Sequence, residues 1–117
     1  MAENHDLGIK GEALALEHVL NLGYELLEKN WRFRKMEIDL IARDKKQIVF
    51  IEVKTRANDN FGKPYEFVSK SKQKLIATAA NFYLEKLGFM AEARFDIISI
   101  SLEPTYHLEH IRDAFYT

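Results

Sequence analysis

The stretch EIDLIARDKKQIVFIEVK, residues 37–54, holds two runs rich in Ile, Val and Phe that are joined by a polar segment at 43–46. Residues of this kind favour β-strands, and apolar side chains occupy successive positions in both runs. Apolar side chains on both faces are typical of a sheet that is covered on both sides. The stretch therefore predicts a buried β-hairpin.

Charged residues stand at the open end of this predicted hairpin. With a four-residue turn at 43–46, Glu37 lies opposite Glu52, and Asp39 lies diagonal to Glu52. Because side chains alternate along a strand, the three acids and Lys54 are expected on one face of the sheet. Uncompensated buried charge is costly, so crowded carboxylates need positive charge nearby. Lys54 supplies one cation, and Mg²⁺ is a natural source of the rest because it binds carboxylate oxygens.

An Asp on one strand followed by Glu-x-Lys on the next resembles the signature of the PD-(D/E)xK nuclease superfamily. The fuller pattern resembles the YraN-type uncharacterised family of that group, over nearly the whole chain. One position departs from it, because Met36 stands where the family usually has a glycine, which indicates a slightly different entry into the strand. The matching blocks are Gly8-x-x-Gly11-Glu12-x-x-Ala15, Gly23-Tyr24, Asn30-Trp31-Arg32, Glu37 to Ala42, Phe50 to Arg56, Gly62-x-Pro64, Lys72-Gln73, Arg94-Phe95-Asp96 and Ala114-Phe115.

The resemblance implies a single restriction-endonuclease-like α/β domain over residues 1–117. Its implied activity is the hydrolysis of phosphodiester bonds in DNA, branched or junction DNA included, with Mg²⁺ or Mn²⁺ as cofactor. Asp39 and Glu52 are the implied metal ligands, aided by the Val53 carbonyl. Lys54 would orient the attacking water and offset charge in the transition state.

Further residues have roles that the resemblance suggests and that a plainer explanation also fits. Glu37 is assigned a second metal or the tuning of Lys54. Glu12 matches a helix glutamate that some relatives add to the metal site, but acids near a helix start are also favoured by the helix dipole. The expected nucleic-acid contacts are Arg32, Arg56, Lys72 and Gln73, although such residues are most often solvent-facing.

Two other classes of function remain open on the sequence alone. One is a nuclease-like fold that binds nucleic acid or a protein partner without cutting it, and the other is a structural module whose acidic end is a salt-bridged cap. Trp31 is expected to pack in the core, because a lone tryptophan is more often a core residue than a surface on which a base stacks. Asp96 is interpreted as structural, hydrogen-bonding a neighbouring loop, and the four histidines are left outside any site.

Charge is unevenly distributed along the chain, although the net charge is only −1. Residues 29–74 carry thirteen Lys and Arg against six Asp and Glu. Three of those acids are the expected site carboxylates, and Glu66 is expected close to them. The remaining positive surface is suited to phosphates, while an ordinary solvated face is the alternative.

The rest of the chain completes an α-β-β-β-α-β order, with a mixed central sheet flanked by the helices. Residues 7–22 predict a helix that ends at Gly23, and residues 69–87 predict a second helix that ends at Gly88. Strands are expected at 24–27, continuing through 31–33, and at 95–102, while the tail at 106–116 is ambiguous. Residues 58–64 predict a loop. The first helix is expected to bury Ile9, Ala13, Leu16 and Leu20.

Composition adds bounds on class and compartment. A chain of 117 residues with 47% apolar content is long enough for one core. The chain has no cysteine, which fits a reducing compartment. No apolar run approaches the roughly 20 residues of a membrane span, and the acidic start lacks the features of a signal peptide. We expect a cytoplasmic protein with DNA as partner and no membrane association, whose oligomeric state is open and compatible with a homodimer.

Overall fold

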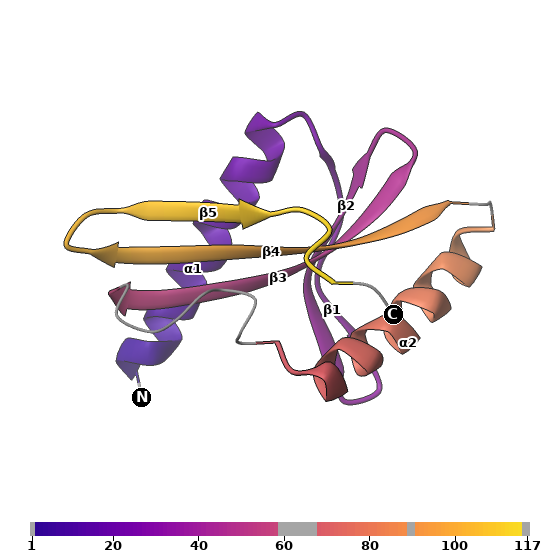
Figure 1. Ribbon diagram of the computed structural model, residues 1–117, viewed down its shortest axis with the longest axis horizontal. Coiled ribbons are helices and arrows are strands. Elements are labelled where there is room, and N and C mark those ends of the chain that lie inside the picture. The colour runs from indigo at the N-terminus through magenta and orange to yellow at the C-terminus, as the bar shows by residue number, and fades with distance from the viewer. Residues whose placement is uncertain (1, 59–67, 89–90, 116–117) are drawn as a thin grey trace.

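The computed structural model describes residues 2–58, 68–88 and 91–115, with the backbone alone for residues 2–5 and 58 (Figure 1). These residues form a small α/β protein with one five-stranded mixed sheet and two helices. The elements are α1 (Ala2–Asn21), β1 (Glu25–Phe33), β2 (Met36–Asp44), β3 (Gln47–Asn58), α2 (Lys70–Leu87), β4 (Glu92–Glu103) and β5 (His107–Ile111).

The strands lie in the order β1-β2-β3-β4-β5. Strands β1, β2 and β3 form an antiparallel meander, β4 runs parallel to β3 after the α2 crossover, and β5 is antiparallel to β4. The expected order is confirmed and gains β5 from the ambiguous tail. The two expected segments of the first strand are one strand, β1, with a bulge between Leu26 and Glu28. The predicted loop begins at Asn58, the last residue of β3, and the rest of it lies outside the described residues.

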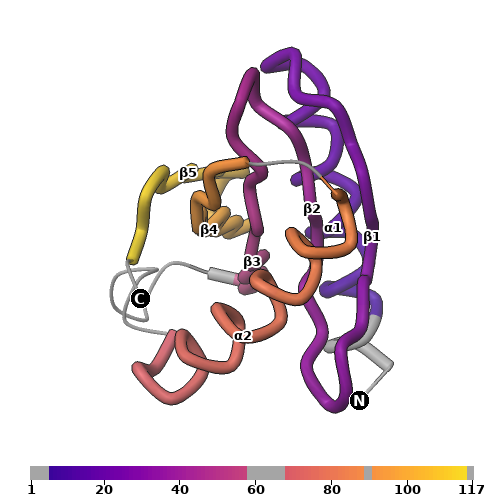
Figure 2. The backbone as a smooth tube through the Cα atoms, turned by 90° about the vertical axis from the view of Figure 1, so that its right-hand side faces the viewer, coloured from indigo at the N-terminus to yellow at the C-terminus, as the bar shows by residue number. Residues whose placement is uncertain are grey.

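The two helices cover opposite faces of the sheet, as the apolar hairpin predicts (Figures 1 and 2). One buried cluster joins Ile48 and Phe50 of β3 to α2, and a second joins Val49 and Ile51 to α1. The side chains of successive β3 residues therefore enter different cores, which confirms a sheet buried on both sides. Within the described residues, no helix is both long and apolar enough to cross a membrane.

Helix α2 forms where the sequence predicts it. The Ser69 hydroxyl caps its start by accepting a hydrogen bond from the Lys72 backbone N–H at 3.1 Å. Gly88 ends it with a φ of 73°, a conformation that glycine adopts without strain. Its buried residues are Ile76, Ala79, Ala80 and Tyr83.

The predicted register of the β2–β3 hairpin is wrong by two residues. The turn has two residues, because Asp44 pairs with Gln47, and Leu40 pairs with Ile51 where the prediction paired it with Val49. Lys45, in the turn, has a φ of 57°, the sign that tight hairpin turns require at their first central residue. Such a turn matches the twist of the strands, so both strands extend further than a four-residue loop allows. Glu37 is therefore not opposite Glu52.

The predicted stripe of α1 is wrong at Ile9, which is 57% exposed, and at Leu20, which is 49% exposed, whereas Leu16 packs against the α1-side core. The helix packs on the sheet through smaller residues, among them Gly11 and Ala15. A Cβ atom on Gly11 would lie 1.6 Å from the Oγ1 atom of Thr55 on β3, so only glycine permits this approach. The predicted stripe and the stripe that contains Gly11 and Ala15 both fit a helical period. The second faces the sheet because it lets the backbone of α1 approach β3 more closely.

Candidate functional site

Asp39 lies where β2 separates from β3. Strand pairing runs from Asp44–Gln47 to Leu40–Ile51, and side-chain alternation breaks at Asp39, because Ile38 packs in the α2-side core and Leu40 in the α1-side core. Beyond that pair, the Asp39 Oδ2 atom accepts a hydrogen bond from the Val53 backbone N–H at 2.8 Å. The carboxylate thus takes the place of a strand carbonyl and is held against β3.

Glu52 lies within β3, next to Ile51, and is buried, with a residue exposure of 8%. Two lysines approach its Oε1 atom: the Nζ atom of Lys72 lies at 2.8 Å and that of Lys54 at 3.7 Å. Lys54 projects from the same strand, whereas Lys72 comes from the first turn of α2. Helix α2 therefore brings a second ammonium group to Glu52, although the sequence analysis expected Lys72 only as a nucleic-acid contact.

Burial, followed by the negative charge of Glu52, raises the pKa of Asp39 to about 7, while the hydrogen bond from the Val53 N–H acts in the opposite direction. Burial by itself would lower the pKa of Lys72, but its hydrogen bond to Glu52 and the charge of that carboxylate outweigh burial and raise it. The two carboxylates are thus unequal: Glu52 has ammonium partners, whereas Asp39 is held by one backbone N–H and titrates near neutral pH.

Glu12 brings a third carboxylate towards the site from α1, and its charge also raises the pKa of Asp39. The Glu12 Oε1 atom is buried and has no hydrogen-bond partner among the residues that the structure describes. A buried acceptor of this kind is costly unless a donor or a cation completes it. Across residues 2–58, 68–88 and 91–115, no three acids or histidines reach metal-ligand geometry.

Glu37 does not join this cluster in the way that the predicted hairpin required. It pairs with Arg32 across β1 and β2, and the Arg32 Nη2 atom lies 3.0 Å from its Oε2 atom. The sequence predicted that Glu37 would be the third acid of the cluster. In the structure the third acid near Asp39 is Glu12. Alternation fails as a guide because it is interrupted within β2.

The other expected nucleic-acid contacts occupy several environments. Arg56 is half-buried on β3. The Gln73 Nε2 atom donates to the Val68 carbonyl at 3.0 Å, so this amide fixes the chain just before α2.

Glu66 lies outside the described residues. Met36 is the first residue of β2 and pairs with Phe33, and the positive φ of this turn, 59°, is at Arg34.

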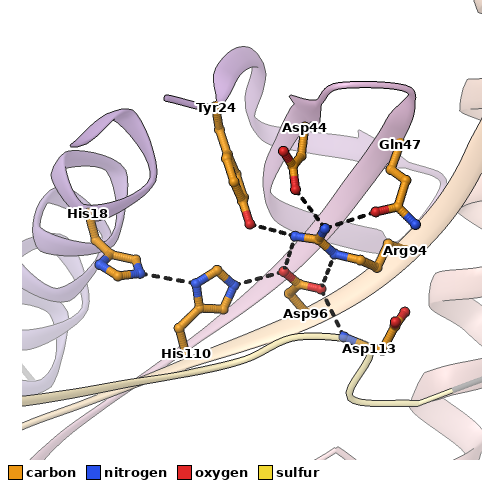
Figure 3. Close-up of polar contacts among 8 residues, drawn as sticks. All are labelled: His18, Tyr24, Asp44, Gln47, Arg94, Asp96, His110 and Asp113. Atoms are coloured by element: carbon orange, nitrogen blue, oxygen red, sulfur yellow. Dashed lines mark hydrogen bonds and ion pairs between the residues drawn. The ribbon is translucent and has the colours of Figure 1, made fainter. Parts of the chain in front are cut away.

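A separate buried polar network lies on the α1 side of the sheet (Figure 3). The Arg94 guanidinium donates to both carboxylate oxygens of Asp96 at 2.9 Å, and to Asp44, Gln47 and the Tyr24 hydroxyl. Such a connected set of charge-assisted hydrogen bonds is suited to ordering a core. Sequence analysis singled out the Arg94-Phe95-Asp96 block but not these partners.

Asp96 is fully buried, and its expected structural role is confirmed because it accepts from the Asp113 backbone N–H at 3.2 Å. Its Oδ2 atom lies 2.7 Å from the His110 Nε2 atom, and His110 in turn contacts His18 of α1 at 3.0 Å (Figure 3). Burial would raise the pKa of Asp96, but the hydrogen bonds from His110 and Arg94 outweigh it and lower the pKa. We assign this network to stability.

The fold and this geometry define a class: a small α/β protein whose central strands carry a half-buried aspartate next to a buried glutamate that pairs with two lysines. The model of the uncharacterised protein family UPF0102 matches residues 11–100. A UPF0102 protein of Flavobacterium psychrophilum is 44% identical over 117 residues, covering 99% of this chain and 98% of the relative. One of Geobacter metallireducens is 46% identical over 114 residues, covering 96% and 93%. The chain belongs to the UPF0102 family, which confirms the YraN-type resemblance.

Proposed function

We propose that this chain is a divalent-metal-dependent nuclease that hydrolyses phosphodiester bonds in DNA, on a domain of the restriction-endonuclease-like PD-(D/E)xK type. The observation that carries the proposal is the pair formed by half-buried Asp39 and buried Glu52 on adjacent strands, with Lys54 beside Glu52. A purely structural ion network gains most when each buried carboxylate has a cation. Here the pKa of Asp39 is raised to about 7, so the fold retains a charge that destabilises it, as functional sites commonly do.

Mg²⁺ or Mn²⁺ is the cofactor that this donor set fits. The oxygens of Asp39, Glu52 and the Val53 carbonyl would hold it, and the unpartnered Glu12 oxygen offers a further acceptor. A bound divalent cation lowers the pKa of a water molecule and polarises the phosphoryl oxygen. Occupancy by a cation would also keep Asp39 ionised at neutral pH, because it reverses the local charge balance.

The lysines carry the remaining chemistry. We assign Lys54 to orienting the attacking water and to offsetting charge that develops on the phosphoryl group. Lys72 has two roles: its ammonium neutralises Glu52 when the metal is absent, and it is released to a phosphate oxygen when a cation takes over that carboxylate. Arg32, Arg56 and Gln73 would follow the nucleic-acid backbone, and Glu37 contributes by positioning Arg32.

A module that binds nucleic acid or protein without cleavage is the second candidate. The ion pair of 2.8 Å between Lys72 and Glu52 favours it, because that pair already neutralises one of the two carboxylates. In such a module the acidic pair would remain as a cap at the end of the hairpin. The two candidates differ in a single measurable property, which is strand scission.

A cleavage screen separates the candidates. Branched, linear duplex and single-stranded DNA are incubated with the protein in Mg²⁺, in Mn²⁺ and in EDTA. Lys54→Ala should lower cleavage by about 100-fold or more while binding stays within a few-fold, which is typical of losing one preorganised electrostatic group. Lys46→Ala, an exposed lysine in the β2–β3 turn, is the matched control. Scission of no substrate by the wild-type protein in either metal would reject the nuclease.

A further inference from the structure

An apolar pocket of about 370 Å³ lies between the β1–β2 turn and α2. Ligand pockets typically have volumes from about 300 Å³ upwards, and they combine apolar walls with a few polar groups. The pocket is lined by Phe33, Arg34, Lys35, Met36, Leu75 and Thr78. Leu75 is 58% exposed, so an apolar side chain of this wall is open to solvent.

The pocket's aromatic wall already bears a flat cation. The Arg34 guanidinium carbon lies 5.0 Å from the centroid of the Phe33 ring, and that ring also packs on Phe82 with centroids 4.5 Å apart. Aromatic rings and guanidinium planes are the two surfaces on which proteins stack unpaired bases. The polar edge of a base also needs donors, and the side chains of Arg34 and Lys35 provide them.

Cations predominate around the pocket: its two charged lining residues, Arg34 and Lys35, are both positive, although Glu28 and Glu37 flank the first wall segment. Residues 29–36 contain four Lys and Arg, residues 70–78 contain three, and neither segment contains Asp or Glu. These segments are the two that form the pocket walls. A positively charged surface complements a polyanion. An apolar pocket without this charge would accept any hydrophobic ligand. The occupant must therefore combine a flat apolar group with negative charge on both sides.

The pocket lies close to the proposed catalytic site along both β2 and α2. Along β2, Met36 is three residues from Asp39, a separation of about 10 Å in a strand. Along α2, Leu75 follows Lys72 by three residues, a rise of about 4.5 Å. A strand of stacked nucleotides advances about 3.4 Å per nucleotide, so about three nucleotides span this distance.

We propose that this pocket binds an unpaired nucleobase of the nucleic-acid strand whose phosphate lies at Asp39 and Glu52. The inference rests on the proposed function and adds to it that the protein acts on substrates with a displaced or single-stranded base within about three nucleotides of the scissile phosphate. The Arg34 guanidinium, which lies over the Phe33 ring, stacks on the base, Leu75 and Met36 close its apolar sides, and the surrounding lysines bind the flanking phosphates.

The test compares two probes that differ only in their bases: a single-stranded thymidine oligonucleotide and an abasic oligonucleotide of equal length. Dissociation constants are measured in EDTA, so that no cleavage is required. The ratio of the two constants removes the phosphate contribution and isolates the bases. Stacking of one base predicts a preference of about tenfold for the base-bearing probe.

Two variants at exposed positions of α2 test whether the preference for the base-bearing probe arises in the pocket. Leu75→Ser removes an apolar wall and Thr78→Leu fills part of the space, so each should reduce the preference to about twofold. Asn81→Leu makes a comparable change on the same helix outside the pocket lining and should keep the tenfold preference. An equal ratio in all four proteins, a ratio near one in the wild type, or no binding of either probe would overturn the proposal.

The outcome is separable from that of the nuclease proposal. A protein that shows the pocket-dependent preference but cuts no substrate in Mg²⁺ or Mn²⁺ retains the base site and loses the nuclease. Conversely, Mg²⁺-dependent scission of probes with equal base-bearing and abasic affinities retains the nuclease and rejects the base site.

Discussion

Replacing Asp39 by Asn should stabilise the protein, and the gain should grow as the pH rises. The folded state raises the pKa of this carboxyl from 3.8 to about 7. Below pH 4 the group is protonated in both states, so the variant and the wild type have similar stability. Between pH 4 and pH 7 the folded state retains a proton that the unfolded state has lost, and the wild type loses free energy of unfolding.

The size of this effect follows from the shift. About three pKa units at 1.36 kcal/mol each give up to roughly 4 kcal/mol at pH 7 and above, or roughly 1.4 kcal/mol per pH unit on the way. An amide at position 39 cannot ionise, and its oxygen still accepts the Val53 N–H. The variant should therefore escape the loss while keeping the contact with β3.

Urea unfolding at pH 4 to 8 in EDTA measures the difference directly. Asp6→Asn, at an exposed position of α1, controls for the loss of one surface charge. Mg²⁺ should narrow the gap at pH 8, because the cation stabilises the ionised wild type and has less to bind in the variant. A constant difference between Asp39→Asn and wild type across this pH range would refute the assignment of a carboxyl that titrates near neutrality.

Three further predictions concern cations, buried charge and packing. Lys72→Ala should raise the affinity of the free protein for Mg²⁺ in calorimetry, because it removes the ammonium that competes for Glu52, and should reduce the salt slope of duplex binding by about 0.9; unchanged values in both assays would contradict it. Arg94→Met should lower the free energy of unfolding by about 3–5 kcal/mol in denaturant titrations, because it leaves a fully buried carboxylate without its guanidinium, and a loss below 1 kcal/mol would count against the network. Gly11→Ala should cost about 1–3 kcal/mol, since its Cβ would overlap the Thr55 side chain, and wild-type stability would show that α1 can move away from β3.

The parts of the fold that the sequence predicted are those with local signals. Helix α2 carries a serine cap, a glycine stop and one apolar face, all within 20 residues. The hairpin carries dense β-branched runs, and these placed Asp39, Glu52 and Lys54 together at one end of it. Local propensity and pattern agree in both cases, which is when such arguments succeed.

The errors arose where an unusual backbone conformation or a contact between distant parts of the chain made the choice. The register depended on Lys45, a non-glycine residue with positive φ, which no pattern in the apolar runs indicates. The buried face of α1 depended on the space next to Thr55, a residue 44 positions further along the chain than Gly11. The Lys72–Glu52 pair depended on where the crossover places the start of α2, and side-chain spacing in the sequence carries no record of that position.

The mixed topology of the sheet has a consequence for the order of assembly. Strands β1 to β3 are contiguous in the sequence and close through two tight turns, Arg34-Lys35 and Lys45-Lys46. The parallel β3–β4 pair can form only after the chain between Asn58 and Glu92 has crossed over, at a higher cost in loop entropy. Contacts between neighbours in sequence generally form faster than those between distant segments.

We therefore expect the meander to form first, and it already contains both Asp39 and Glu52. Their mutual repulsion is present from this early stage, before α2 arrives with Lys72. Substitutions that relieve it should accelerate folding, whereas substitutions in the Arg94 network, which requires β4, should mainly accelerate unfolding. The acids proposed for the chemistry of this protein would then also limit the rate at which it reaches its native state.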